Sequence, residues 1–184
     1  MKTTHGFNIS TGNETMGKVY SFSTMPIATC ASDIPCARLC YVRTHVLRYP
    51  SVRKNYDENT RMLKEGRMYN ELVEDLKEFM DKPRNKKVEL FRWSVAGDMF
   101  STDYYKAMCK TAIGLPHISF WTFTKQFDIL RECLKIMTPP KNLTIILSQW
   151  NDFRPPVDLK DVFGVAYYDD GTHGQDIPKD GFVC

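Results

Sequence analysis

Strand-like and helix-like segments alternate along most of this 184-residue chain, and this order restricts the fold more than any other feature of the sequence. Short apolar or β-branched runs predict strands at 19–23, 87–93, 118–122, 143–147 and 163–167. Apolar residues at helical spacing predict helices at 53–80, 101–113 and 127–137. Such alternation is typical of βα units joined by right-handed crossovers. We therefore expect one α/β domain over residues 1–184, built as a partial (βα) barrel or a parallel sheet of about five strands.

Glycine, proline and hydroxyl residues mark the expected helix ends. Gly66 predicts a break or bend within the first helix, and Pro83 predicts its end. Ser101 or Thr102 is placed to cap the start of the second helix, and Gly114 to cap its end.

Composition excludes some classes of protein. The contents of 42% hydrophobic and 26% charged residues are those of an ordinary globular protein, and the net charge of +3 is too small to require nucleic acid as a partner. No run of about 18 apolar residues exists, so we expect no membrane span. The polar start has no apolar segment of the kind that directs secretion, so we expect a cytoplasmic protein.

Three cysteines gather in the loop after the first predicted strand, with the spacing Cys30-x5-Cys36-x3-Cys40. Clustered thiols in a reducing compartment indicate metal ligands more than disulfides. Thiolates are suited to iron–sulfur clusters, and three of them leave the fourth iron of a cubane open to an outside ligand. A zinc site with His45 or Cys184 as fourth ligand remains an alternative, as do three thiols without a ligand.

The remaining cysteines are scattered. Cys109 and Cys133 lie within predicted helices beside apolar residues, where a thiol acts as a small core side chain. Cys184 is the last residue and is a candidate fourth metal ligand, a frayed end, or the first cysteine of a motif that continues beyond this sequence.

Polar residues follow the predicted strands, and the carboxyl ends of parallel strands meet at one edge of a sheet, where ligands bind. A charge on the second strand, Arg92, would need an anionic ligand or a partner if it pointed inward. The alternative interpretation is that these groups are ordinary polar loop and turn residues. The candidate ligand-binding residues at this edge are Arg92, Ser94, Gly97, Asp98, Thr124 and Gln149.

A basic stretch follows the cysteines. It comprises Arg43, Arg48, Arg53, Lys54 and Arg61, with tyrosines interleaved. This composition is compatible with a phosphate-binding surface for nucleic acid or with a solvated helix face.

Three segments resemble a known family. Residues 35–41 (PCARLCY), 91–98 (FRWSVAGD) and 118–125 (ISFWTFTK) are similar to the phage gene-product-88-like family and to proteins related to radical S-adenosylmethionine (SAM) enzymes. The resemblance implies a radical-SAM-like partial barrel. In it, Cys30, Cys36 and Cys40 would hold a [4Fe–4S] cluster whose open iron binds SAM beside residues 94–98. It also implies an electron donor, an unidentified substrate and, for a phage protein, the cytoplasm of the bacterial host.

Three hypotheses of function follow. The first is a radical-SAM-like enzyme with three cysteine ligands. The second is a non-enzymatic iron–sulfur or zinc protein, structural or nucleic-acid-binding, with Cys184 or His45 as fourth ligand. The third is an iron–sulfur enzyme that uses the open iron as a Lewis acid without SAM. The ligand count separates the first two hypotheses.

Overall fold

A computed structural model describes residues 1–12, 17–32, 34, 36–150, 153–168, 177 and 182–183, with backbone alone at 39, 45, 47, 182 and 183. Its centre is a seven-stranded sheet in which the strands follow one another in chain order. The first strand is antiparallel to the second, and every later neighbour is parallel. The strands are β1 (Ile9–Ser10), β2 (Tyr20–Phe22), β3 (Leu90–Trp93), β4 (Ser119–Thr124), β5 (Leu143–Gln149), β6 (Gly164–Tyr167) and β7 (Phe182–Val183).

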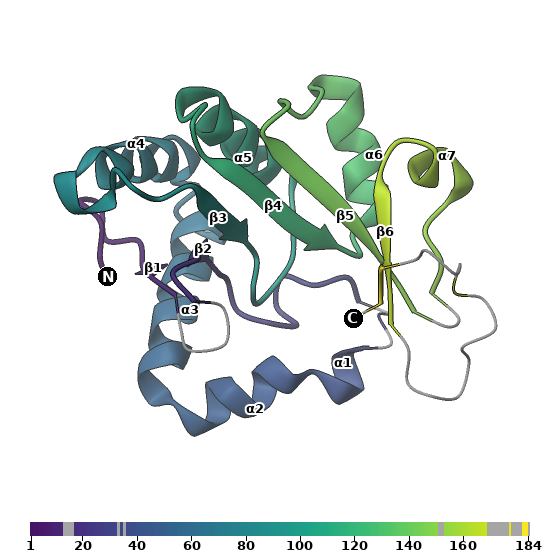
Figure 1. Ribbon diagram of the computed structural model, residues 1–184. Helices are drawn as coiled ribbons and strands as arrows, with labels where there is room; N and C mark the ends of the chain where they lie inside the picture. Colours follow the sequence, from purple (N-terminus) through teal and green to yellow (C-terminus); the bar gives the residue numbers. More distant parts are fainter. Residues whose placement is uncertain are drawn as a thin grey trace.

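The helices lie between the strands in the chain. They are α1 (Cys36–Leu39), α2 (Tyr41–Arg48), α3 (Pro50–Lys64), α4 (Tyr69–Asp81), α5 (Thr102–Gly114), α6 (Phe127–Ile136) and α7 (Val157–Lys160), with a 3₁₀ turn at Pro83–Asn85. Helices α4, α5 and α6 cover one face of the sheet, whereas α1 and α2 lie on the side toward which the strands point (Figure 1). Successive crossovers of one hand place helices on one face in this way.

The core lies between the sheet and these helices. On β3, Phe91 and Trp93 are buried while Leu90 is 46% exposed, as expected for side chains that alternate between two faces. The buried rings meet edge to face: the centroids of Phe22 and Trp93 lie 5.9 Å apart at 67°. Trp93 also meets Tyr104 of α5, at 5.9 Å and 86°, which joins the sheet to the helix layer.

The structure confirms the α/β class and the parallel sheet. The expected strands and helices are present with shifted ends, and the break at Gly66 separates α3 from α4. The hydroxyl of Ser101 accepts a hydrogen bond from the Tyr104 N–H at 3.1 Å, so this residue is the cap of α5. None of the helices in the part of the chain that the structure describes is long and apolar enough to cross a membrane.

Two expectations need correction. The sheet has seven strands rather than about five, because β1 and β7 have only two residues each and so show no alternation. The segment after the first strand, expected as a loop, contains the short helix α1 and the two-turn helix α2. The short β1 is held by its pairing with β2 rather than by a pattern of its own.

A buried amide joins α3 to the first two strands. The Asn59 amide group donates to the carbonyl oxygens of Asn8 (3.0 Å) and Ser23 (2.9 Å), and its oxygen accepts from the Asn8 N–H at 2.8 Å. Asn59 is fully buried, so no water replaces these bonds if the amide is removed.

We expect Asn59→Ala to lower the free energy of unfolding by about 3 kcal/mol, because it leaves buried backbone groups unpaired. Urea denaturation followed by circular dichroism measures this loss. Asn55→Ala is the matched control, since Asn55 lies one turn earlier on α3 and is only half buried. An equal loss in the two variants would contradict the structural role given to Asn59.

Candidate functional site

The three clustered cysteines lie in the connection that follows β2. Cys30 ends a turn, Cys36 is the first residue of α1, and Cys40 lies between α1 and α2. All three are partly exposed. The N–H of Ile27 donates to the sulfur of Cys30 at 3.4 Å. The chain therefore presents three accessible thiols within eleven residues on the side toward which the strands point (Figure 1).

Electrostatics in this segment favour the neutral thiols. Burial, together with the charges of Asp98, Cys36 and Cys40, raises the pKa of Cys30 to about 11, although the hydrogen bond from the Ile27 N–H opposes this rise. Burial also raises the pKa of Cys36, whereas the ammonium of Lys125 lowers it. Thiolates at these positions would repel one another and need a nearby positive charge, as a bound metal supplies.

The donor set suits a soft metal, but the ligands are not preassembled. Among the residues that the structure describes, no group of three His, Cys, Asp or Glu side chains is positioned to hold a metal ion. Thiolate ligands match iron–sulfur chemistry and zinc. Ligation would thus require the thiols to move together, which couples metal binding to the conformation of this segment.

The connection after β2 that carries the three cysteines is called the cysteine segment here. Two of its threonines pack closely against the backbone of Gly97, in the loop after β3. The hydroxyl oxygens of Thr24 and Thr29 lie 3.0 Å apart, and the Thr29 hydroxyl donates to the Met25 carbonyl at 2.9 Å. Gly97 lies against both hydroxyls with a φ of +76°, and a Cβ at this position would overlap them. Glycine is therefore required here both for the backbone conformation and for space.

The carboxylate of Asp98 links the ends of β3 and β4 by hydrogen bonds, near the cysteines. It accepts hydrogen bonds from the N–H of Met99 at 2.6 Å and from the N–H of Lys125 at 2.9 Å. Burial raises the pKa of this carboxyl, while these bonds and one from the Thr124 side chain oppose the rise. The carboxylate thus holds the exit of β4 against the exit of β3.

Helix α3 holds the same segment from its other side. The Met25 N–H donates to the Thr60 hydroxyl at 2.7 Å, and the Lys64 ammonium donates to the Ala28 carbonyl at 2.8 Å. The Gln126 amide adds a bond of 3.2 Å to the Thr29 carbonyl. Residues 24–30 are therefore fixed by α3, by the β3 exit and by the β4 exit.

The structure brings some of the predicted ligand-binding residues together and separates others. Gly97, Asp98 and Thr124 meet beneath the cysteine segment. Arg92 lies apart from them, with its guanidinium 5.1 Å from the centroid of the Phe123 ring on the neighbouring strand. The Gln149 oxygen accepts from the Lys160 ammonium at 2.9 Å, which turns this side chain toward α7.

Ser94, directly after β3, does not continue the alternation of buried and exposed side chains along that strand. Its φ of +54° is unusual for a residue other than glycine and ends the strand pattern. Its buried hydroxyl faces that of Tyr104 on α5 without forming a hydrogen bond of good geometry. The side chain therefore points toward α5, and a ligand at this edge would meet the backbone of the loop.

The remaining cysteines and His45 lie outside the cysteine triplet in the sequence. Cys109 and Cys133 are fully buried, as expected for core residues. Cys184 and the side chain of His45 lie outside the described residues, so their part as a fourth ligand stays a prediction.

Sequence reasoning missed the residues that position the site. Thr24 and Thr29 carried no motif, although each lies just after a strand or beside a cysteine, and Lys125 lay within the 118–125 segment without being named as a site residue. The Lys125 ammonium also lies 5.8 Å from the centroid of the Trp150 ring, which stacks on Tyr168 at 3.8 Å. The position of these residues at strand ends was the only available signal.

Comparison with known proteins gives a family and no further relative. The family model described as gene product 88 matches residues 2–160. No curated protein and no solved structure matches the chain.

We expect Gly97→Ala to destabilise the protein by about 3 kcal/mol or more, since a left-handed φ and a steric overlap combine. Gly17→Ala is the matched control: Gly17 has a φ of +63°, but no atom of the described residues lies within 4 Å of an added Cβ. The control should lose only about 1–2 kcal/mol, the conformational cost alone. Thermal unfolding of both variants checks this, and equal losses would show that the contact with the threonines is unimportant.

Proposed function

Since the chain belongs to the gene product 88 family, whose description states no activity, we propose from its own residues that it is an iron–sulfur protein and a radical-SAM-like enzyme. Cys30, Cys36 and Cys40 would hold a [4Fe–4S] cluster. The observation that carries the proposal is the position of three partly exposed cysteines near the exits of β3 and β4, in a segment whose start is held by Gly97 and Asp98 through Thr24 and Thr29.

The arrangement of the sheet supports this proposal. Strands β2 to β7 are parallel and follow chain order, and this is the order of strands in a partial (βα) barrel. In such folds the ligands bind at the carboxyl ends of the strands. The cysteine segment follows the first parallel strand, β2, which is where the resemblance to radical SAM enzymes puts the cluster loop.

The surrounding residues have distinct parts in this proposal. The Lys125 ammonium favours the charged form of Cys36 and would offset the negative charge of a thiolate-bound cluster. Asp98 is a positioning residue, because its carboxylate is already engaged by backbone N–H groups of both strand exits. The backbone of residues 94–98 would face the amino-acid part of SAM. When bound, the cluster would supply the electron that cleaves the SAM sulfonium.

We expect protein purified without oxygen to be brown and to hold about four irons per chain, the count of a [4Fe–4S] cluster. Cys30→Ser, Cys36→Ser and Cys40→Ser should each lose most of this iron. Cys133→Ala, which changes a buried thiol on α6, should keep it. Iron and sulfide analysis with visible absorption gives the measurement. A colourless protein that carries zinc would refute the cluster.

Binding of SAM is tested separately, by electron paramagnetic resonance of the reduced cluster with and without SAM. We expect the g-values to shift on addition of SAM, because a new ligand changes the coordination of the open iron. Cys184→Ser should leave both the iron content and the shift unchanged. An unshifted spectrum, with iron lost in Cys184→Ser, would instead indicate a closed four-cysteine site without SAM.

A further inference from the structure

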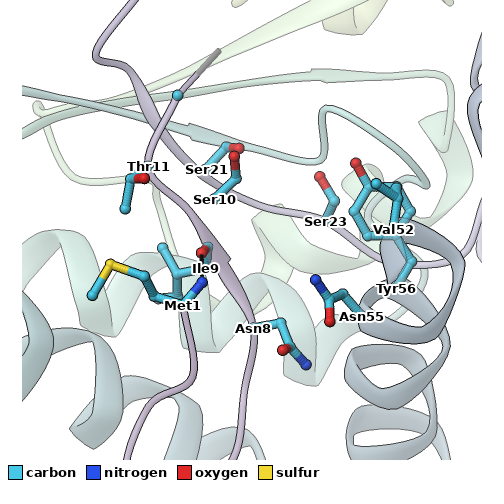
Figure 2. Close-up of a pocket in the computed structure, with 11 residues that line it drawn as sticks. Met1, Asn8, Ile9, Ser10, Thr11, Ser21, Ser23, Val52, Asn55 and Tyr56 are labelled. Atoms are coloured by element: carbon cyan, nitrogen blue, oxygen red, sulfur yellow. Dashed lines mark hydrogen bonds between the residues drawn. The ribbon is translucent and has the colours of Figure 1, made fainter. Parts of the chain in front are cut away.

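A polar pocket of about 280 Å³ lies between the first two strands and α3. Ser10 and Ser21 line it from the strands, Ser23 follows the end of β2, and Asn55 and Tyr56 line it from α3. Figure 2 shows the three serine side chains along one wall, with Asn55 and Tyr56 to one side of them. Among the residues that the structure describes, Cys30, Cys36 and Cys40 do not line this pocket.

The alternation of side chains along β1 and β2 places the serine hydroxyls in a row. Ser10 pairs with Ser21 across the antiparallel strands, and Ile9 pairs with Phe22. Ile9 and Phe22 are buried in the core, so the alternating serines point to the opposite face of the sheet. Two residues beyond Ser21, the hydroxyl of Ser23 lies at the same face and accepts from the Ala96 N–H at 3.3 Å.

The polar side chains that line the pocket differ in their exposure. Ser21 is only 6% exposed, whereas Ser10 is exposed and Asn55 is half buried. Hydroxyl and amide groups that face a cavity need hydrogen-bond partners inside it, which solvent or a polar ligand supplies.

The lining restricts the chemistry of the ligand. No acidic or basic side chain is among its described residues, and the α-amine of Met1 at one end donates to the Ile9 carbonyl at 2.6 Å. A charged ligand would thus lack a counter-charge in the lining side chains. Hydroxyl and amide groups both donate and accept, so they match a ligand that carries several hydroxyl groups. The volume is near the lower end of ligand pockets, about 300–1,000 Å³, and suits a single ring.

We propose that this pocket binds an uncharged, hydroxyl-rich ring, such as the furanose or pyranose ring of a sugar. Ser21 and Asn55 form its main hydrogen bonds, and Ser10 adds a third. The inference holds whether or not the cysteines bind iron, since it uses none of them.

The pocket is nevertheless adjacent to the cysteine segment. Tyr56 lines the pocket and also packs against the small cluster of Val42, Val46 and Ala96, where Cys40 is a further neighbour. Burial raises the pKa of the Tyr56 hydroxyl, and a hydrogen bond with Ser23 opposes this rise, so the phenol stays neutral at physiological pH. A ring bound here would contact Tyr56, which packs against the same apolar cluster as Cys40.

Saturation-transfer difference NMR with D-ribose and D-glucose tests the proposal on the full chain. We expect saturation of the protein to reach the ring protons of at least one of the two sugars. Ser21→Ala and Asn55→Ala should each weaken binding about fivefold, the effect of one lost hydrogen bond. Ser119→Ala, an exposed serine on β4 outside the pocket, is the matched control and should bind as the original protein does.

Ser10→Ala provides a second variant at an exposed position if Ser21→Ala fails to fold. Inorganic phosphate is the charged probe, and we expect no competition from it. Absence of transfer to both sugars would overturn the proposal. So would binding unchanged in the variants at Ser21 and Asn55, or displacement of the sugars by phosphate.

Discussion

The contact of Gly97 with two threonine hydroxyls fixes the start of the cysteine segment, as far as Cys30, relative to the sheet. Thr24 begins the segment and Thr29 precedes the first cysteine, so both ends of this turn rest on the same glycine. Because the contact is made by backbone, it leaves no room for a side chain and little for a shift of either loop. Asp98 then extends the connection to the exit of β4. The thiols would otherwise have no defined relation to the strand ends where ligands bind.

Electrostatics and geometry in this region have opposite effects on metal binding. Burial and neighbouring negative charge favour protonated thiols, which do not ligate. The position of the segment, its accessible sulfurs and the nearby Lys125 favour a thiolate-bound cation. A metal reverses the first effect, because its charge stabilises the thiolates that bind it and replaces their mutual repulsion by attraction. If the protein binds the proposed cluster, loading with iron is expected to release protons and to close the segment.

The sequence predicted those features of the fold that leave a local pattern of residue types and spacings. The parallel strands, the cap at Ser101 and the break at Gly66 each left a local pattern. The two-residue strand β1 left none, since pairing with β2 alone defines it. The same limit applies to the site. The cysteines were visible as a cluster, but the contacts of Thr29 with Gly97 and Asp98 span about seventy residues of chain and appear only when β2 and β3 pair.

Helix α3 connects the cysteine segment to the polar pocket. Asn59 and Thr60 hold the end of β2 and the start of the cysteine segment, while one turn earlier Tyr56 lines the pocket and packs against the same small apolar cluster as Cys40. A shift of α3 would therefore change both regions together. If the thiols move to bind a cluster, the hydrogen bonds from this helix decide whether that movement reaches the pocket. The buried amide of Asn59, which bonds to Asn8 beside β1 and to Ser23 at the end of β2, opposes such a shift, so closure should be confined to the residues beyond Thr29.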